Sequence, residues 1–321
     1  MKDLTHIDIN INGEVQTRDI NVKNGKITDE KISLNADIDG SKIKDSSIDG
    51  SKLKDGSIGD EKLQGSGRYN FLKGKKVCFF GDSITDSTGY PKEFCKLTGA
   101  IEINRGVSGT QISGASNESF LSRLTWRNND DLSYTRVGLP SACDLIIVYG
   151  GINDWAKDVI FGTMEEAIPT ESIERSGSPM YPEPSMVVDL PTTFCGACKM
   201  LFRNLREKYP TTPIVALSLH HVNSTSFRAW NEFSTWNPQT GEYAIKVKSN
   251  GKTLKDYKEA YTESARMFGV PVIDLFEMGF SALDTNDNAR YFKDGLHMNE
   301  AGAKKMAYYV ADQITKLLHE L

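Results

Sequence analysis

The stretch "VCFFGDSITDSTGY", residues 77–90, decides how this chain must be interpreted. Apolar residues that favour a strand run directly into Gly81, and a serine, Ser83, follows two positions later. A serine at such a turn commonly caps a helix or satisfies a loop. The rest of the sequence determines whether Ser83 also has a chemical role.

Composition excludes several classes of function. Of the 321 residues, 39% are hydrophobic and 25% are charged, which is typical of a globular protein with one large domain and something smaller. The net charge of −5 gives neither a basic surface for nucleic acid nor a polybasic patch for a membrane. No apolar run approaches the roughly 20 residues of a membrane span, and the first residues lack the apolar core of a secretory signal. We therefore expect synthesis in the cytoplasm without a signal peptide, and no nucleic-acid or membrane partner.

The five cysteines argue against a disulfide scaffold. Cys195 and Cys198 have the spacing of a redox or zinc motif, but no second Cys/His pair lies nearby. They also continue a helical pattern with Leu201 and Leu205, in which small sulfur-containing residues pack well. We interpret them as structural residues.

Residues 1–67 differ in pattern from the remainder. Residues 1–30 alternate like β-strands, with turns at Asn12-Gly13 and Asn24-Gly25. In residues 31–67 an apolar residue recurs every five positions, at Ile38, Ile43, Ile48, Leu53, Ile58 and Leu63. One apolar residue in five cannot close a core within a single chain of this length.

Two interpretations of residues 31–67 remain open. A polar linker requires no regular spacing, whereas a stalk shared by several chains does, so the spacing favours the stalk. The near-literal doublet "IDGSKIKDSS", "IDGSKLKDGS" resembles the short repeats of phage tail-fibre and baseplate proteins, which are commonly trimeric. The resemblance implies a homotrimer formed through residues 31–67, a location on the virion tail and contacts with other tail proteins.

Residues 68–321 alternate between short apolar segments and helical patterns. The expected strands lie at 76–80, 101–104, 144–149, 213–219 and 271–275, and the clearest helices at 191–209, 252–268 and 301–318. This alternation predicts an α/β domain in which helices cover both faces of a parallel sheet. Ligands bind beyond the carboxyl ends of such strands, where Ser83 and the "YGGIND" segment at 149–154 both fall.

Acyl transfer by a serine requires a base, a group that orients the base, and donors for the oxyanion. Of the five histidines, His6 and His319 lie in poor positions, near the two ends of the chain. Asp294 precedes His297 by three residues, a spacing that lets its carboxylate hold one imidazole nitrogen while the other faces a serine. The alternative is that Asp294 caps the last helix and His297 lies at the surface.

Four separated motifs resemble those of the SGNH (GDSL-type) hydrolases. They are "GDSI" at 81–84, "NRGVSG" at 104–109, "GIND" at 151–154 and "DGLH" at 294–297, in the order of that family. The resemblance covers about residues 75–318 and implies a flavodoxin-like fold with a five-stranded parallel sheet. It also implies a serine hydrolase that needs no metal and no cofactor.

The resemblance further implies a role for each matching residue. Ser83 would be the nucleophile, His297 the base and Asp294 the group that orients it. The oxyanion hole would consist of the Ser83 and Gly106 backbone N–H groups and the Asn153 side-chain amide. Asp82 and Asp154 adjoin these positions in "GDSI" and "GIND" and are expected to brace the loops through hydrogen bonds.

Two long segments, 155–189 and 222–251, follow strand ends and are expected either to shape the pocket of Ser83 or to elaborate the surface. The second contains an expected turn at 237–241. Trp155, His220 and Trp230 are the candidate substrate contacts, and the role of His221 stays open. Tryptophan and tyrosine among small polar residues suit sugar rings, whereas a lipase would require a broad aliphatic lid.

We therefore expect a carbohydrate esterase that removes an acyl group, most simply an O-acetyl group, from a cell-surface polysaccharide. Two alternatives stay open: a lipid or thioester acyl hydrolase, and a non-catalytic receptor-binding tail protein on the same fold.

Overall fold

A computed structural model describes residues 48, 69–114, 119–125, 138–168, 177–178, 181–182, 190–224, 231–239, 242–280 and 285–319. The chain divides into two compact units, Met1–Lys62 and Leu63–Leu321, and the described helices and strands all belong to the second. The expected β-strands in residues 1–30 and the domain boundaries at 30/31 and 67/68 lie outside the described residues, as does the stalk in 31–67 except for residue 48.

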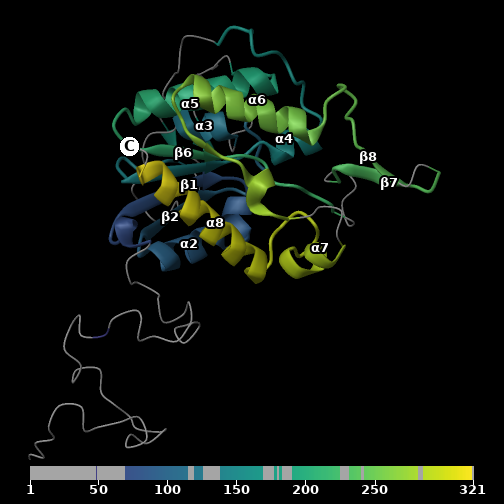
Figure 1. The fold of residues 1–321 in the computed structure, drawn as a ribbon. Coiled ribbons are helices and arrows are strands. Elements are labelled where there is room, and N and C mark those ends of the chain that lie inside the picture. The colour runs from purple at the N-terminus through teal and green to yellow at the C-terminus, as the bar shows by residue number, and fades with distance from the viewer. Residues whose placement is uncertain are drawn as a thin grey trace, which may run out of the picture. The chain divides into compact units, whose positions relative to one another are not determined.

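Five parallel strands form the central sheet, in the order β2-β1-β3-β6-β9 (Figure 1). Their bounds are Lys76–Gly81 for β1, Ile101–Gly106 for β2, Leu145–Tyr149 for β3, Ile214–Leu217 for β6 and Val272–Ile273 for β9. The chain passes from β1 to β2 on one side of β1 and then crosses to β3 on its other side. The strand order therefore reverses beside β1. In open α/β sheets this reversal creates the crevice in which ligands bind. The predicted five-stranded parallel α/β fold is confirmed.

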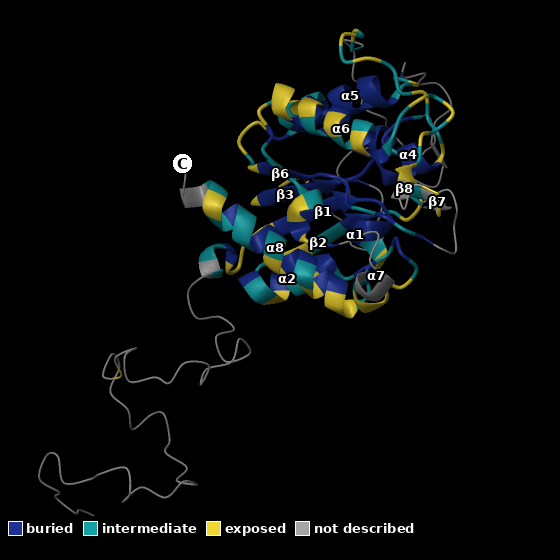
Figure 2. Ribbon diagram, turned by 45° about the vertical axis from the view of Figure 1, so that its right-hand side comes forward, coloured by how far each residue is buried: buried dark blue, intermediate teal, exposed yellow. Residues whose placement is uncertain are grey.

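Helices cover both faces of the sheet (Figure 1, Figure 2). On one face α2 (Tyr90–Thr98) packs against α8 (Glu300–His319), and on the other α5 (Phe194–Lys208) packs against α6 (Leu254–Met267) and α3 (Phe120–Thr125). The sides of these helices that face the sheet are buried, as their amphipathic patterns require. No helix in the described ranges is long and apolar enough to cross a membrane.

Short elements complete the described part of the domain. Two helices begin directly after strands, α1 (Ser83–Ser87) after β1 and α4 (Ile152–Ala156) after β3. The others are η4 (Asn70–Leu72), η7 (Leu275–Met278), α7 (Thr285–Tyr291) and the antiparallel pairs β4 (Gly177–Ser178) with β5 (Tyr181–Pro182) and β7 (Phe233–Asn237) with β8 (Glu242–Ile245). The turn expected at 237–241 falls between β7 and β8.

Strand β1 is buried between the two helix layers. The Phe79 ring packs edge-on against Tyr90 and Phe94 of α2, with centroid distances of 5.8 and 5.6 Å. Phe80 packs in the same way against Phe120 of α3, at 5.0 Å. Successive side chains of a strand point to opposite faces, so aromatic contacts on both sides explain the continuous apolar run that precedes Ser83.

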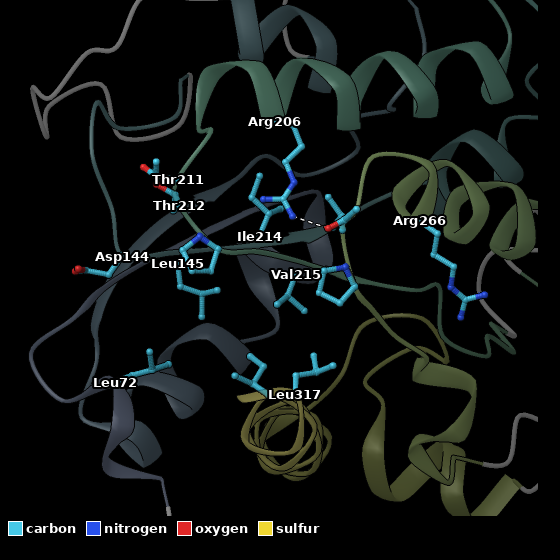
Figure 3. Close-up of a pocket in the computed structure, with 15 residues that line it drawn as sticks. Leu72, Asp144, Leu145, Arg206, Thr211, Thr212, Ile214, Val215, Arg266 and Leu317 are labelled. Atoms are coloured by element: carbon cyan, nitrogen blue, oxygen red, sulfur yellow. Dashed lines mark hydrogen bonds between the residues drawn. The ribbon is translucent and has the colours of Figure 1, made fainter. Parts of the chain in front are cut away.

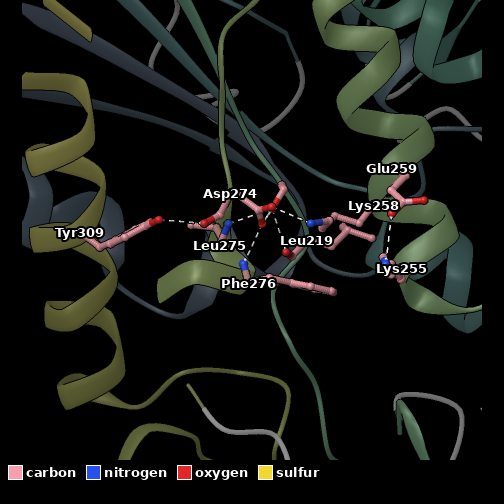
Figure 4. A network of polar contacts seen from close by, with 9 residues as sticks. Leu219, Lys255, Lys258, Glu259, Asp274, Leu275, Phe276 and Tyr309 are labelled. Carbon is pink, nitrogen blue, oxygen red and sulfur yellow. Dashed lines mark hydrogen bonds and ion pairs between the residues drawn. The ribbon is translucent and has the colours of Figure 1, made fainter. Parts of the chain in front are cut away.

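A polar network around Asp274 joins the last strand to helices of both faces (Figure 4). The carboxylate accepts hydrogen bonds from Lys258 Nζ of α6 at 2.6 Å and from Ser218 Oγ at 2.9 Å. The Asp274 carbonyl accepts one from Tyr309 Oη of α8 at 2.9 Å. Burial alone raises the pKa of Asp274, but the bonds to its carboxylate from Lys258, the Phe276 N–H and Ser218, together with the Lys258 charge, outweigh burial and lower the pKa. The network fixes the carboxyl ends of β6 and β9.

All five cysteines are free, and Cys195 and Cys198 are buried in α5. Burial raises the pKa of the Cys195 thiol to about 11, so this group is a neutral thiol at pH 7. The interpretation of these two residues as packing residues is confirmed by their place in the core.

A large apolar cavity of about 770 Å³ lies at the edge of the sheet where the strands begin (Figure 3). Its walls include Leu72, Leu145, Ile214 and Leu317. Leu145 and Ile214 are the first residues of β3 and β6, whereas Ser83 follows the carboxyl end of β1. In a parallel sheet these are opposite edges, so the cavity does not belong to the surroundings of Ser83.

Candidate active site

Ser83 is the first residue of α1, and Asp82 caps that helix by accepting the Ile84 backbone N–H at 2.9 Å. A side chain at Gly81 would place its Cβ 1.9 Å from Thr85 Oγ1. Only glycine therefore lets the helix fold back so closely on the strand. Among the described groups, none accepts the Ser83 backbone N–H. The abrupt end of the strand thus presents both the hydroxyl and a free amide hydrogen of Ser83.

The side chains of Ser83, His297 and Asp294 form a hydrogen-bonded chain. His297 Nε2 lies 3.0 Å from Ser83 Oγ, and His297 Nδ1 lies 2.7 Å from Asp294 Oδ2. An ionised carboxylate only accepts, so Nδ1 carries the proton and Nε2 is free to accept the serine proton. The alternative in which Asp294 caps the last helix does not apply, because α8 begins at Glu300.

Asp294 is held in its ionised form. Burial by itself raises the pKa of this carboxyl group, but the hydrogen bonds from the His297 side chain and from the His297 and Leu296 backbone together lower it. The two backbone bonds, at 2.7 and 3.0 Å, both end on Oδ1 and leave Oδ2 for the imidazole. Asp294 can therefore stabilise an imidazolium that forms on His297.

His220 holds the loop that carries His297 and is not exposed to a substrate. The ring is fully buried; its Nε2 lies 3.1 Å from the Leu296 carbonyl and its Nδ1 lies 2.7 Å from Tyr149 Oη. Nε2 must donate to the carbonyl, so Nδ1 accepts the Tyr149 hydroxyl proton. Burial lowers the pKa of His220 to about 4, which keeps the ring neutral at pH 7. The prediction of His220 as a substrate contact is wrong.

The backbone of residue 223 supports the same loop. Asn223 donates its N–H to the Gly295 carbonyl at 2.9 Å. A Cβ at Gly295 would lie 2.0 Å from the Asn223 carbonyl oxygen, and Gly295 has a φ of +78°. The glycine between Asp294 and Leu296 is therefore needed for both its conformation and its close contact.

Trp155 is likewise buried and is not available to a substrate. All five residues of α4 are buried, so a large side chain on this helix faces the core. Lys248 Nζ lies 4.4 Å from the centroid of the Trp155 ring. The prediction of Trp155 as a substrate contact is wrong, while Trp230 lies outside the described residues and stays a prediction. His221, whose role was open, lies 2.9 Å from Glu232 Oε2 and stacks on Phe276.

The Asn153 amide lies close to Asp82, the residue that precedes the nucleophile. Its Nδ2 donates to the Thr110 carbonyl at 2.9 Å and makes a longer contact of 3.4 Å with Asp82 Oδ2. Only the first of these is a short hydrogen bond, so the second amide hydrogen is weakly held.

Gly106 does not provide the expected oxyanion donor, because its N–H is already bonded. It donates to the Asn104 side-chain oxygen at 2.9 Å. A Cβ at Gly106 would lie 2.4 Å from the Asp86 backbone nitrogen. This glycine allows the end of β2 to pack closely against α1, and its assignment to the oxyanion hole is corrected.

Gly109 is the glycine of this loop with a free N–H, since no group in the described ranges accepts it. Its φ is +77°, and no heavy atom lies within 4 Å of a Cβ built there. The Gly109 carbonyl accepts Lys157 Nζ at 3.0 Å, and the next carbonyl, that of Thr110, accepts the Asn153 amide. Sequence reasoning missed Gly109 because "NRGVSG" contains two glycines, which only their hydrogen-bond partners distinguish.

Asp154 braces the same loop, as expected. It accepts the Ile112 N–H at 2.9 Å and both the N–H and the hydroxyl of Ser113, at 3.0 and 2.7 Å. Burial raises the pKa of Asp154 to about 6 and that of Asp82 to about 7. Two buried carboxyl groups therefore lie behind the candidate site.

Comparison with known proteins identifies the family of this chain and solved structures of similar fold. The model of the GDSL-like Lipase/Acylhydrolase family matches residues 79–305, most of the chain. A crystal structure of a Lactobacillus plantarum protein is 23% identical, covers 76% of this chain and 98% of its own, and has a TM-score of 0.55. A possible lipase from Chitinophaga pinensis is 18% identical, covers 76% of this chain and 98% of its own, and has a TM-score of 0.47. The lipase/acylhydrolase from Enterococcus faecalis is 18% identical, covers 75% of this chain and 96% of its own, and has a TM-score of 0.43. No curated protein matches the chain.

Proposed function

Because this chain belongs to the GDSL-like lipase/acylhydrolase family and is therefore an ester hydrolase, we propose that Ser83 is its nucleophile and that it removes O-acetyl groups from a carbohydrate. The observation that carries the catalytic assignment is the chain of hydrogen bonds from Ser83 Oγ through His297 to Asp294. A serine that merely capped a helix would require neither partner.

The geometry supports acyl transfer in two steps. Ser83 Oγ forms a bond to the acyl carbon while His297 Nε2 takes the hydroxyl proton. The ester C–O bond then breaks, and His297 gives the proton to the departing sugar oxygen, which leaves as a hydroxyl group. Water attacks the acyl-enzyme by the same route and releases the acid together with the free Ser83. Asp294 holds the imidazole in the required tautomer throughout.

The oxyanion of the tetrahedral intermediate would receive three donors. Two are the Ser83 and Gly109 backbone N–H groups, which are free among the described groups. The third is the Asn153 amide hydrogen that makes only the 3.4 Å contact with Asp82 and can turn to a substrate oxygen. The two backbone donors are fixed before the reaction and therefore cost no reorganisation during it.

The β7–β8 hairpin supports a carbohydrate as the substrate. Its register pairs Trp236 with Tyr243, and aromatic residue types suit the apolar faces of sugar rings. Asn223, which bonds to Gly295 in the loop of His297, forms a bridge with Asn231 at the base of this hairpin. The hairpin projects from the body of the domain near α4 and α7 (Figure 1).

A short acyl group is the simplest choice. The large apolar cavity among the described residues lies at the opposite edge of the sheet from Ser83, so it does not favour a long acyl chain at this serine.

Hydrolysis of p-nitrophenyl esters of increasing chain length tests the acyl preference. We expect activity on the acetyl ester and a decline with length, whereas a rise with length would favour a lipid or thioester hydrolase. Acetate release from O-acetylated polysaccharides tests the sugar. Ser83→Ala should abolish both activities, and Thr315→Ala, which removes a hydroxyl bonded within α8, should retain them. An active Ser83→Ala protein would remove the nucleophile assignment, and an inactive wild type would favour the non-catalytic receptor-binding protein.

We also propose that residues 31–67 join three chains into a stalk that displays the enzyme on a phage tail. The five-residue spacing of isoleucine and leucine supports this arrangement. Light scattering on the full chain should give a trimer, and the double variant Ile43→Asp, Leu53→Asp should give an active monomer. A monomeric wild-type chain would contradict the stalk.

A further inference from the structure

Arg123 of α3 is a buried cation beneath the candidate active site. Its side chain is 1% exposed, and its guanidinium carbon lies 4.5 Å from the Phe80 ring centroid and 4.7 Å from that of Phe120. Burying a charge is costly unless hydrogen bonds and favourable contacts compensate for it. A group so placed needs a specific reason, and its partners indicate one.

The guanidinium bonds to three segments that build the site. Nη1 donates to the Arg105 carbonyl at 2.7 Å, near the end of β2. Nη2 donates to the Gly81 carbonyl at 3.0 Å, at the end of β1, and to Thr110 Oγ1 at 3.3 Å. One side chain therefore links the residue two positions before Ser83 to the residue directly after Gly109.

Each proposed oxyanion donor lies within two residues, or one residue and one hydrogen bond, of a group that Arg123 contacts. The Ser83 N–H follows Gly81 by two residues, and the Gly109 N–H belongs to the residue before Thr110. The Asn153 amide is bonded to the carbonyl of Thr110 itself. A shift of the guanidinium would change the distances among all three donors.

We infer that Arg123 is a positioning residue that sets the geometry of the oxyanion hole by joining the ends of β1 and β2 to the loop of Gly109. The inference rests on the proposed function of Ser83, Gly109 and Asn153. Arg123 itself touches no substrate. Lysine cannot replace it fully, because a planar fork with donors in several directions serves acceptors on three segments, whereas an ammonium is a single point.

This role has a distinct kinetic signature. Donors that act on the developing oxyanion stabilise the transition state more than the bound ester. Loosening them should lower kcat while leaving KM nearly unchanged. Misplacement of reacting groups by about 1 Å costs about 10²-fold in rate, so we expect a loss of about that size in Arg123→Met and a smaller loss in Arg123→Lys.

The experiment compares these two variants with the wild type on p-nitrophenyl acetate, together with inhibition by a trifluoromethyl ketone that forms an oxyanion when Ser83 adds to it. We expect kcat and inhibitor affinity to fall in parallel. An Arg123→Met protein with wild-type kcat, or one in which only KM rises, would overturn the inference.

A second pair keeps the test decisive if the Arg123 variants do not fold. Thr110→Val removes a hydroxyl that accepts from Arg123 and donates to the Val107 carbonyl at 2.8 Å, whereas Thr110→Ser retains both bonds. We expect a lower kcat in the valine variant only; equal kcat in both would overturn the inference. Failure of the proposed function would show itself separately, as an active Ser83→Ala protein.

Discussion

His297 Nε2 lies 3.0 Å from Ser83 Oγ although 214 positions separate the two residues. The contact depends on two aspartates, each of which fixes its own loop by accepting hydrogen bonds from nearby backbone N–H groups. Asp82 accepts the N–H of Ile84, and Asp294 accepts those of Leu296 and His297. Local backbone bonds therefore fix each of the two loops, and the sheet places the loops next to each other.

The tautomer of His297 can be tested through Asp294. In Asp294→Asn the side-chain oxygen can still accept the backbone N–H groups, but an amide NH₂ then faces His297 Nδ1. Nδ1 must accept, so Nε2 carries the proton and cannot take that of Ser83. We expect kcat on p-nitrophenyl acetate to fall by up to about 10⁴-fold with little change in unfolding temperature. Asp312→Asn, which alters an ion pair with Lys316 in α8, is the matched control, and full activity in Asp294→Asn would contradict the assignment.

The two glycines of "NRGVSG" should respond differently to alanine. Gly106→Ala places a Cβ 2.4 Å from the Asp86 backbone nitrogen, so we expect a large loss of unfolding temperature. Gly109→Ala meets no atom within 4 Å but must adopt a φ of +77°, which costs about 1–2 kcal/mol. We expect this variant to fold and to lose kcat, because relief of the strain moves its N–H. A stable Gly106→Ala protein combined with a fully active Gly109→Ala protein would reverse the two roles.

Loss of His220 should loosen the loop of His297. His220→Phe keeps an aromatic ring but leaves the Leu296 carbonyl and the Tyr149 hydroxyl without their buried partner. Each unsatisfied group costs about 1–3 kcal/mol, so we expect a lower unfolding temperature and a lower kcat. His221→Phe is the control for kcat, since His221 bonds to Glu232 and not to the loop. Its unfolding temperature is not compared, because this variant leaves the buried Glu232 carboxylate without that partner. Unchanged kcat in His220→Phe would show that the loop does not depend on this bond.

The sequence predicted the features that depend on neighbouring residues. Strands buried on both faces are continuous apolar runs, and the Asp294–His297 pair is separated by only three positions. The sequence did not predict features that depend on packing between residues far apart in the chain. His220 ends a strand at the expected edge, yet Tyr149 and Leu296 enclose it. Trp155 directly follows the "GIND" motif, on a helix buried all round.

The role of Arg123 was even harder to predict from the sequence. Nothing in "FLSRLT" distinguishes it from a solvated surface arginine. Its importance arises from carbonyl groups at the ends of two strands and from two aromatic rings, which only the folded sheet places around it.

The buried carboxyl group of Asp82 should make stability depend on pH. Burial raises the pKa of Asp82 to about 7 in the folded protein, whereas an unfolded aspartate titrates near 4. The folded state thus keeps a proton that the unfolded state loses, so this contribution to stability is complete below about pH 4 and is lost as the pH rises through 7. Asp82→Asn is neutral at every pH and should escape that loss.

The decisive quantity is the difference in unfolding free energy between Asp82→Asn and the wild type, because titrations that are independent of Asp82, such as that of His220, cancel in it. Between pH 5 and pH 8 we expect Asp82→Asn to gain a few kcal/mol of unfolding free energy relative to the wild type. Each unit of pKa difference between the folded and unfolded states contributes on the order of 1.4 kcal/mol. Asp144→Asn is the control. The Lys76 N–H lowers the pKa of Asp144, so its carboxylate is ionised in both states above pH 5 and its variant should show no such trend. An Asp82→Asn difference that stays constant over this range would mean that Asp82 is already ionised beside Ser83 at pH 5.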